Sequence, residues 1–342
     1  MELIRGLTNL REVHRGSVVT IGTFDGIHLG HQALLRRTQE HARRLGRPAM
    51  LLTFEPMPRE YLAPHDPPPR LTSLRERWRI LVGSGLDCLC VLRFGESLRN
   101  LSGEEFTQRL IRDVRMPVVV VGHDFRFGRR GEAGVARLVQ AGERAGFSVD
   151  VVDPVRMDGQ RVSSSGIRIA LARSDFAVAS GWLGRAYSMR GRVVRGNRLG
   201  RTLGFPTANL RLERRRAPLG GIFAVRVRGC VASALDPGLP GVASLGTRPT
   251  VGGVETLLEA HVFDYSGDLY GREIEVEFAA KLRDEERFAD LDSLTAQMKV
   301  DAARARQILG MTAPVPDRAT GPGDVTEPDN VTGPDDVPGK GD

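Results

Sequence analysis

The sequence predicts a protein of two folded parts: an α/β domain with a parallel sheet, then a small β-barrel with a long terminal helix. Three observations lead to this prediction. The 342 residues are enough for two domains of ordinary size. Up to about residue 185, apolar strand-like runs alternate with helical patterns, as in a parallel sheet covered by helices on both faces. After Tyr187, short strand-like segments separated by glycine-rich turns predominate, which is typical of a barrel.

The strands of the α/β part are predicted from short apolar runs, because buried parallel strands are short and rich in β-branched residues. These runs lie at 18–23, 49–54, 88–92, 117–122 and 148–153. Apolar residues at helical spacing predict the intervening helices at 31–45, 73–84, 102–113 and 134–146. We expect the boundary between the two parts near 183–188, with domains at 1–184 and 185–311.

The second part contains two segments that alternate polar and apolar residues, as half-buried strands do. They are "GIFAVRVRG" at 221–229 and "EIEVEFA" at 273–279. An amphipathic helix is predicted over 291–309. Residues 312–342 differ from everything before them, because they repeat "TGPGDV", "TEPDNV" and "TGPDDV" and hold few large apolar residues. Such a segment buries too little surface to offset its ordering entropy, so it is predicted to be a disordered acidic tail.

Composition narrows the possible partners. The net charge is +7, and seven acids lie in the last thirty residues, so the folded body is strongly basic. The basic residues are scattered without interleaved aromatic side chains, which favours phosphate-containing substrates over nucleic acid. Only three cysteines are present, and no apolar run approaches the roughly 18 residues of a membrane span. No signal peptide is evident at the N-terminus, so we expect a cytoplasmic protein without membrane association.

The stretch "GTFDGIHLGH" at 22–31 predicts an anion site at a strand-to-helix junction. Such a junction lies at the carboxyl edge of a parallel sheet, and the amides of a helix N-terminus attract anions. His28 and His31 are one helical turn apart, and Gly30 lets a ligand approach the backbone. The alternative is a metal site, but His-x-x-His is the wrong spacing for the His-x-x-x-His zinc motif.

A second candidate phosphate site is "VSSSGIRIAL" at 162–171. Three serines precede a short apolar helical pattern, which indicates a helix cap followed by a first turn. Arg168 lies about one turn into this helix, so hydroxyls, amides and a guanidinium together could clamp a phosphate. The alternative is a capped helix with a surface arginine.

These motifs resemble those of known enzymes. The histidine motif resembles the HxGH signature of the Rossmann-like nucleotidyltransferases, and the serine motif resembles their SSTxIR segment with Ser165 in place of threonine. "VGHDFRFG" at 121–128 is similar to a signature of bacterial FAD synthetases, although Met57 and the loop "RRGEAG" depart from their usual pattern. The resemblance implies catalytic roles for His28, His31 and Arg168. It implies nucleotide or flavin contacts at Gly22, Phe24, Asp25, Gly30, Asp124, Phe125, Arg126, Ser164 and Ser165.

In the second part, "GRTLGFPTANL" at 200–210 resembles the signature of riboflavin kinases. The resemblance implies that Thr207 and Asn209 bind Mg²⁺, which suits hard oxygen ligands. It also implies that Glu259, in "LLEAHVFD", is the general base on the ribityl 5′-hydroxyl, and that Arg283 positions the flavin. Further substrate or nucleotide contacts are implied at Gly196, Gly200, Arg201, Gly204 and Pro206, and Phe223 stands where tyrosine is common.

Together the resemblances imply a bifunctional riboflavin kinase and FMN adenylyltransferase. The second domain is expected to make FMN from riboflavin and ATP, and the first to make FAD and pyrophosphate from FMN and ATP. Mg²⁺ is the expected cofactor, and no obligate protein partner is indicated. The alternatives are an enzyme with one inactive module, a nucleic-acid-binding protein, and a flavin-responsive regulator that uses its tail to bind a partner.

Overall fold

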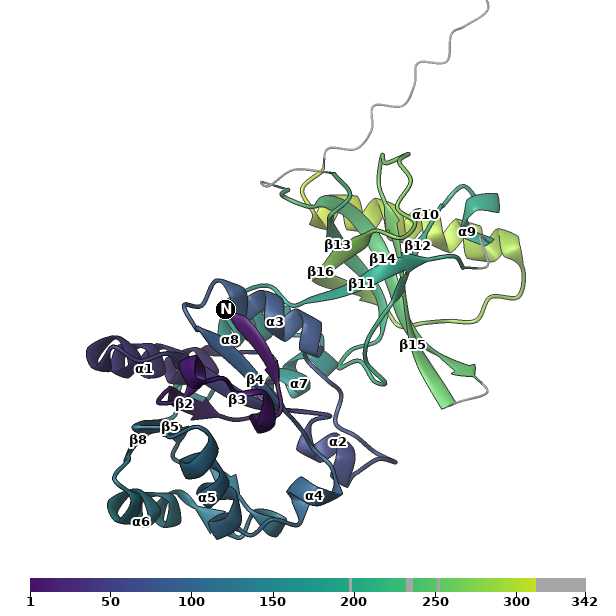
Figure 1. The fold of residues 1–342 in the computed structure, drawn as a ribbon. Helices are drawn as coiled ribbons and strands as arrows, with labels where there is room; N and C mark the ends of the chain where they lie inside the picture. Colours follow the sequence, from purple (N-terminus) through teal and green to yellow (C-terminus); the bar gives the residue numbers. More distant parts are fainter. Residues whose placement is uncertain (197–198, 232–235, 251–252, 312–342) are drawn as a thin grey trace, which may run out of the picture.

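The computed structural model describes residues 1–196, 199–231, 236–250 and 253–311. The chain forms a sheet-based part that carries the N-terminus and a barrel-based part with a long helix (Figure 1). The predicted tail, 312–342, lies outside the described residues, as does the side chain of Arg201. The two-part α/β and β-barrel architecture predicted from the sequence is therefore confirmed for the described residues.

The first part is built on a six-stranded parallel sheet in the order β1-β4-β3-β2-β5-β8. Its strands are β1 (Glu2–Arg5), β2 (Val18–Ile21), β3 (Ala49–Glu55), β4 (Cys88–Arg93), β5 (Val118–Gly122) and β8 (Ser148–Val152). Strands β3 and β4 extend the sheet on one side of β2, whereas β5 and β8 extend it on the other. Open parallel sheets bind ligands at the carboxyl edge where the strand order reverses in this way, which here is between β2 and β5.

The five strands predicted for this sheet are confirmed, and β1 is an addition. The sequence did not predict β1 because this edge strand has only four residues and buries only Ile4. Cys88 and Cys90 lie in β4, and both are free and buried. Cys230 is also free and buried.

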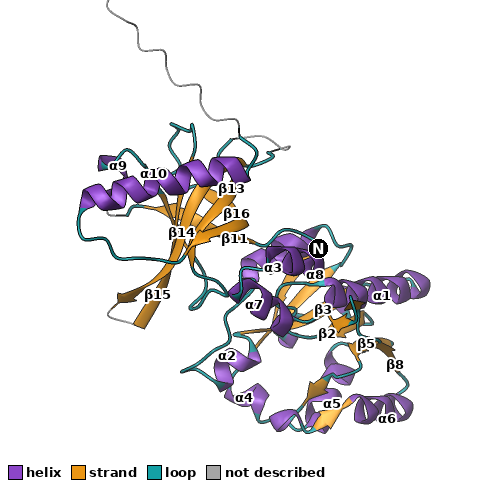
Figure 2. Cartoon of the chain, turned by 180° about the vertical axis from the view of Figure 1, so that it is seen from behind, coloured by secondary structure: helices purple, strands orange, loops and turns teal. Residues whose placement is uncertain are grey.

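Helices cover both faces of the sheet (Figure 2). The four predicted helices are α1 (Leu29–Leu45), α3 (Leu74–Val82), α5 (Gly103–Asp113) and α6 (Val135–Ala145). Four further helices are α2 (Pro58–Leu62), α4 (Glu96–Arg99), α7 (Ser164–Ala172) and α8 (Phe176–Leu183). The Ser163 hydroxyl accepts a hydrogen bond from the Gly166 amide at the start of α7, so the predicted serine cap is confirmed.

Short elements fill the connections of the first part. They are the 3₁₀ turns η1 (Leu7–Asn9), η2 (Glu12–His14) and η3 (Arg129–Gly131), and the strand pairs β6 (Arg126–Phe127) with β7 (Ala133–Gly134) and β9 (Arg156–Met157) with β10 (Gln160–Arg161). No helix in the described part of the chain is both long and apolar enough to span a membrane.

The second part is a closed antiparallel barrel in the order β11-β12-β15-β14-β13-β16. Its strands are β11 (Ser188–Val194), β12 (Ala208–Arg211), β13 (Gly221–Arg228), β14 (Leu239–Thr250), β15 (Gly253–Val262) and β16 (Glu273–Arg283). The short helix α9 (Leu199–Thr202) precedes β12. The predicted terminal helix is α10 (Leu291–Ile308), and it packs on the outside of β13, β14 and β16 (Figure 2).

The barrel part is in direct contact with α3 and with the segment that precedes it. The buried Arg214 guanidinium forms an ion pair with Glu76 of α3, with 2.6 Å between Nη2 and Oε1. The Tyr187 hydroxyl donates to the Leu71 carbonyl oxygen at 3.2 Å. One hydrophobic core runs from α7 and α8 into the barrel interior. The two parts are thus joined by a buried polar and apolar interface.

Candidate active sites

The first candidate site lies at the carboxyl edge of the sheet, where the strand order reverses. A cavity of about 270 Å³ opens there between the loops that follow β2, β5 and β8. The predicted residues that line it are Gly22, Phe24, His28, Gly30, His31, Asp124, Phe125 and Ser164. The fold therefore brings together three motifs that are more than 30 residues apart in the sequence.

His28 and His31 stack face to face at the start of α1. Their ring centroids are 3.7 Å apart, and the Phe24 ring stacks on the other face of His31 at 4.5 Å. His28 caps α1, because its Nδ1 accepts a hydrogen bond from the His31 amide at 3.3 Å. A Cβ at Gly30 would lie 3.1 Å from the His28 ring, so this glycine makes room for the imidazole. The His31 Nδ1 is buried and has no hydrogen-bond partner among the described residues.

Asp25 connects this loop to two other segments. Its carboxylate is buried and accepts hydrogen bonds from the amides of Leu71 and Thr72 and from the Arg168 guanidinium, 2.5 Å away. Its carbonyl oxygen accepts from the Ser164 hydroxyl at 2.8 Å. Asp25 therefore joins the histidine loop to the serine motif, and it does not line the cavity.

Arg168 is oriented by the same contacts. Its guanidinium is held by the Asp25 carboxylate and by the Pro69 carbonyl oxygen, 2.6 Å away. It is not among the residues that line the cavity, whereas Arg161 is. Arg161 forms an ion pair with Asp124 at 2.5 Å. Burial alone would raise the pKa of Asp124, but the hydrogen bond from Arg161 and its positive charge outweigh burial, so the pKa is lowered. Arg161 was not predicted from the sequence. Ser165, which was predicted as a contact, is exposed and does not line the cavity.

Both imidazoles are neutral near pH 7. Burial, with the positive charges of Arg161, Arg168 and Arg185, lowers the pKa of His28 to about 4. Burial and the neighbouring His28 lower the pKa of His31 well below its ordinary value. A neutral imidazole can donate one hydrogen bond, so each ring can offer one N–H group to a ligand.

The His28 shift predicts a pH-dependent stability. The unfolded chain binds a proton at this residue below pH 6.5, whereas the folded chain binds it only near pH 4. The free energy of unfolding should therefore fall as the pH is lowered, by about 2 kcal/mol between pH 7 and pH 5 from His28 alone. Urea unfolding at both pH values would measure this loss. His28→Asn keeps a capping acceptor but cannot take up a proton, so its free energy of unfolding should fall less between pH 7 and pH 5 than that of wild type. His65→Asn is the control and should behave like wild type. Equal losses of stability in all three proteins would contradict the assignment to His28.

A larger cavity adjoins this site. It measures about 940 Å³ and is lined by Phe54, Phe94, Phe125 and Phe127, together with Arg99, Arg126, Arg129 and Arg130. The Phe125 and Phe127 rings stack at 5.4 Å, and Phe125 lines both cavities. An aromatic wall beside several guanidinium groups is suited to a planar ring system that carries a phosphate.

The second candidate site lies on the outer surface of the barrel. Residues directly opposite each other in antiparallel strands point to the same face of a sheet. One such row crosses five strands from β12 to β16 and consists of Asn209, Glu259, Ser244, Ile222 and Arg283. Four of these five residues line a cavity of about 220 Å³, and Asn209 is buried beside it.

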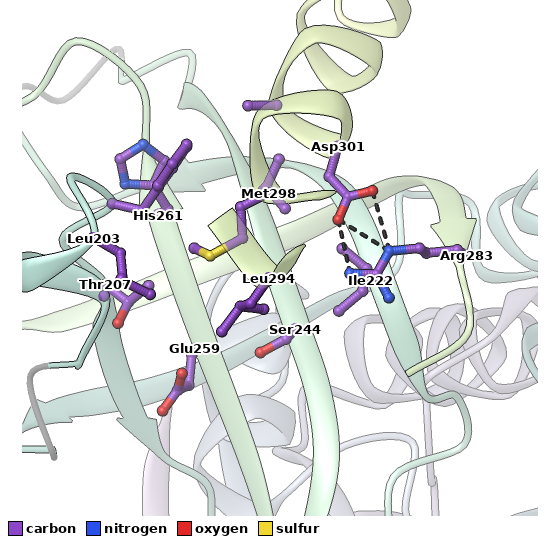
Figure 3. Close-up of a pocket in the computed structure, with 14 residues that line it drawn as sticks. Leu203, Thr207, Ile222, Ser244, Glu259, His261, Arg283, Leu294, Met298 and Asp301 are labelled. Carbon is purple, nitrogen blue, oxygen red and sulfur yellow. Dashed lines mark hydrogen bonds and ion pairs between the residues drawn. The ribbon is translucent and has the colours of Figure 1, made fainter. Parts of the chain in front are cut away.

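Helix α10 closes this cavity from the other side. Leu294, Met298 and Asp301 of α10 face the row of strand residues (Figure 3). The Asp301 carboxylate is buried and accepts hydrogen bonds from Arg283 at 2.9 to 3.1 Å and from Gln297 at 3.0 Å. The cavity thus combines an apolar wall with a carboxylate on one strand and a guanidinium held in place on another.

The glycine-rich motif borders the same cavity. Thr207 and Gly200 line it, and Gly204 forms a turn with a positive φ of 80°. A Cβ at Gly196 would lie 2.5 Å from the Asn209 amide carbon, so Gly196 covers that side chain. The Pro206 carbonyl oxygen accepts from the His261 Nδ1 at 2.9 Å, which fixes the tautomer of this histidine.

Comparisons with known proteins agree with this arrangement. A FAD synthetase family model matches residues 10–166, and a riboflavin kinase family model matches residues 183–309. The bifunctional riboflavin kinase/FMN adenylyltransferase of Escherichia coli strain K12 is 43% identical over 92% of this chain and 100% of its own length. The enzyme of the same name from Pseudomonas fluorescens is 44% identical over 92% of this chain and 99% of its own. The chain belongs to the bifunctional riboflavin kinase/FMN adenylyltransferase family.

A solved structure has the same fold over both halves. The crystal structure of a protein from Streptococcus pneumoniae, described as a macrolide-efflux protein, matches with a TM-score of 0.75 and 31% identity. The match covers 90% of this chain and 99% of that one. The solved structure therefore contains both the sheet part and the barrel part, in the same order as in this chain.

Three residues of the barrel cavity in this riboflavin kinase/FMN adenylyltransferase were not predicted from the sequence. Ser244 shares the row with Glu259, His261 lies two residues further along β15 on the same face, and Asp301 anchors Arg283. His261 had a usable signal, because residues at i and i+2 of a strand share a face. Ser244 and Asp301 had none, because only the barrel pairing and the docking of α10 bring them to the cavity.

Proposed function

We propose that this chain phosphorylates riboflavin to FMN at the barrel site and adenylylates FMN to FAD at the sheet site, with ATP as the donor in both reactions. The observation that carries this proposal is the grouping of the motif residues around two separate cavities, one in each half of the chain. The relatives that match nearly the whole chain are named for the same two activities, which supports it.

At the barrel site, Glu259 is proposed as the general base on the ribityl 5′-hydroxyl. Its carboxylate lines the cavity opposite the apolar wall of Leu294 and Met298, which can cover a flavin ring. Arg283 is proposed to position the flavin, because Asp301 fixes its guanidinium. A carboxylate aimed at an alcohol accelerates phosphoryl transfer by accepting the proton that leaves the attacking oxygen.

Mg²⁺ is proposed at Thr207 and Asn209. No cluster of three His, Cys, Asp or Glu residues in the described part of the chain could hold a metal by itself. Mg²⁺ prefers one or two protein oxygens together with substrate phosphates, and the hydroxyl and amide present here fit that requirement. When bound, the ion would neutralise charge on the ATP phosphates. Gly200 and Gly204 are proposed to let the nucleotide approach the backbone.

At the sheet site, the paired imidazoles are proposed to donate hydrogen bonds to the α-phosphate of ATP. Charge builds up on the phosphate oxygens in the transition state, and fixed donors stabilise it without reorganisation. The amides at the start of α1 add to this effect. Arg161 lies across the same cavity, and the aromatic cavity next to Phe125 is proposed to hold the flavin ring of FMN.

We propose that residues 1–184 form the adenylyltransferase domain and residues 185–311 the kinase domain. Residues 312–342 are proposed to be a disordered tail that neither reaction requires. Helix α8 ends at Leu183 and the first barrel strand begins at Ser188, which supports a boundary between them. The three free, buried cysteines are compatible with the proposed cytoplasmic location.

One assay tests the proposed function. The purified protein is incubated with riboflavin, ATP and Mg²⁺, and the flavins are separated by chromatography. FMN followed by FAD is the expected result, and FAD alone is expected from supplied FMN. Formation of FMN without FAD would indicate an enzyme with one inactive module, and formation of neither would refute the proposal.

A test of the Arg283 assignment uses Asp301→Asn. The amide removes the buried carboxylate that holds the guanidinium, so riboflavin should bind more weakly, with KM raised about 10-fold, the scale of one charged hydrogen bond. Steady-state kinetics of FMN formation at varied riboflavin would measure this. Asp292→Asn, on an exposed part of the same helix, is the control. An unchanged KM for riboflavin in Asp301→Asn would remove this role.

A further inference from the structure

Arg185 lies between the sheet and the barrel, and its guanidinium contacts the loop that leads to His28. Its Nη2 donates to the Gly26 carbonyl oxygen at 2.6 Å, and its Nη1 to those of Ile27 and Leu183 at 3.3 Å. Residue 185 falls in the segment that matches riboflavin kinase, whereas the loop falls in the segment that matches FAD synthetase. A side chain from the second half of the chain therefore holds the backbone of the first site.

The loop that it holds has an unfavourable backbone conformation. Ile27 has a φ of 45° and Phe24 a φ of 51°, in a region that residues with a Cβ rarely adopt and β-branched residues least of all. Both side chains are buried, so they are fixed in place. The Ile27 carbonyl oxygen also accepts from the Gln32 Nε2 at 3.0 Å. Surrounding contacts must maintain such a conformation, and strained segments of this kind gather at functional sites.

The surroundings of Arg185 indicate a positioning role. Among the described residues, no carboxylate forms an ion pair with it, and burial lowers the pKa of Arg185. The carboxylates of Glu76 and Glu275 line the same cavity and attract this charge, but neither forms an ion pair with it. The hydrogen bonds of the guanidinium go to backbone carbonyl oxygens, so this partly buried side chain is better explained by the backbone that it holds in place than by a gain in folding energy. It lines a cavity of about 160 Å³ between the two parts, together with Arg190 and Tyr187.

We propose that Arg185 is a positioning residue for adenylyl transfer, and that the second half of the chain thereby completes the first active site. This inference rests on the proposed FMN adenylyltransferase activity. By fixing the carbonyls of Gly26 and Ile27, Arg185 sets the point at which α1 begins and hence where the stacked imidazoles lie. A displacement of about 1 Å in such groups can lower a rate by about 10²-fold.

The test uses full-length Arg185→Gln and the matched control Arg190→Gln. Arg190 lines the same cavity, but its guanidinium pairs with Glu275 of the barrel and not with the loop. In Arg185→Gln, kcat for FAD formation from FMN should fall about 10- to 10²-fold, with KM for ATP within about threefold of wild type. FMN formation from riboflavin and the melting temperature should match Arg190→Gln. Arg185→Lys, which can still donate to one carbonyl oxygen, should recover part of the lost kcat.

Three results would overturn the inference: FAD turnover in Arg185→Gln equal to that of Arg190→Gln, a parallel loss of both activities together with a lower melting temperature, or no recovery in Arg185→Lys. If Arg185→Gln fails to fold, kcat for FAD formation in Arg185→Lys is compared with that of Arg190→Gln instead, and equal values would overturn the inference. These failures differ from failure of the proposed function, in which the wild-type chain itself makes no FAD from FMN.

Discussion

Replacing His31 with alanine should lower FAD formation from FMN and ATP by at least about 10²-fold, the scale of losing one preorganised donor to a developing anion. FMN formation from riboflavin should remain near the wild-type rate. The reason is the position of His31 between Phe24 and His28, with a buried Nδ1 that has no hydrogen-bond partner in the described part of the chain. His31 also lines the cavity, so the stacked rings hold its imidazole where one N–H group can face a phosphate oxygen.

The control is His41→Ala, on the same helix. The His41 side chain forms a hydrogen bond with Asp150 and does not line the cavity, so its loss should leave both activities in place. Chromatographic rates with FMN as substrate would measure the first effect, and rates with riboflavin the second. Retention of most FAD formation in His31→Ala would mean that the histidine pair serves only to pack and cap α1.

The local features of the histidine loop could be predicted from the sequence, but its support could not. A short apolar strand followed by two glycines and a helical pattern places His28 and His31 at a sheet edge, and the structure has them there. The partners of Asp25 were not predictable, because Leu71, Thr72 and Arg168 come from segments about 45 and 140 residues away. Such partners depend on how whole elements pack, and no local pattern encodes that.

Arg168 and Arg161 illustrate the same limit. A guanidinium one turn into a helix behind three serines could face a ligand or a neighbouring loop, and sequence spacing does not distinguish the two. The structure directs Arg168 to Asp25 and Pro69, whereas Arg161 reaches the cavity from β10. In the barrel, Asp301 could not be predicted, because only the packing of α10 against β16 brings its carboxylate to Arg283.

Of the variants discussed, Glu259→Gln should have the largest effect on FMN formation. The change keeps the size of the side chain and removes its basic oxygen, so kcat for FMN formation should fall by about 10²–10⁴-fold, the usual contribution of a general base. Riboflavin should still bind, because the apolar wall formed by Leu294 and Met298 is unchanged. Quenching of riboflavin fluorescence would measure binding separately from turnover.

This prediction also tests whether the two sites work independently. Glu259 lies on β15 in the barrel, and the cavity that it lines shares no residue with the one that contains His31. FAD formation from supplied FMN should therefore be unaffected by Glu259→Gln. The control is Asp268→Asn, an exposed carboxylate of the same barrel that does not line the cavity, and it should leave both rates unchanged. If Glu259→Gln keeps most of its kinase turnover, the base must be another group. If it loses FAD formation from FMN as well, the two cavities are coupled, and the barrel acts on adenylyl transfer through more than the Arg185 contact.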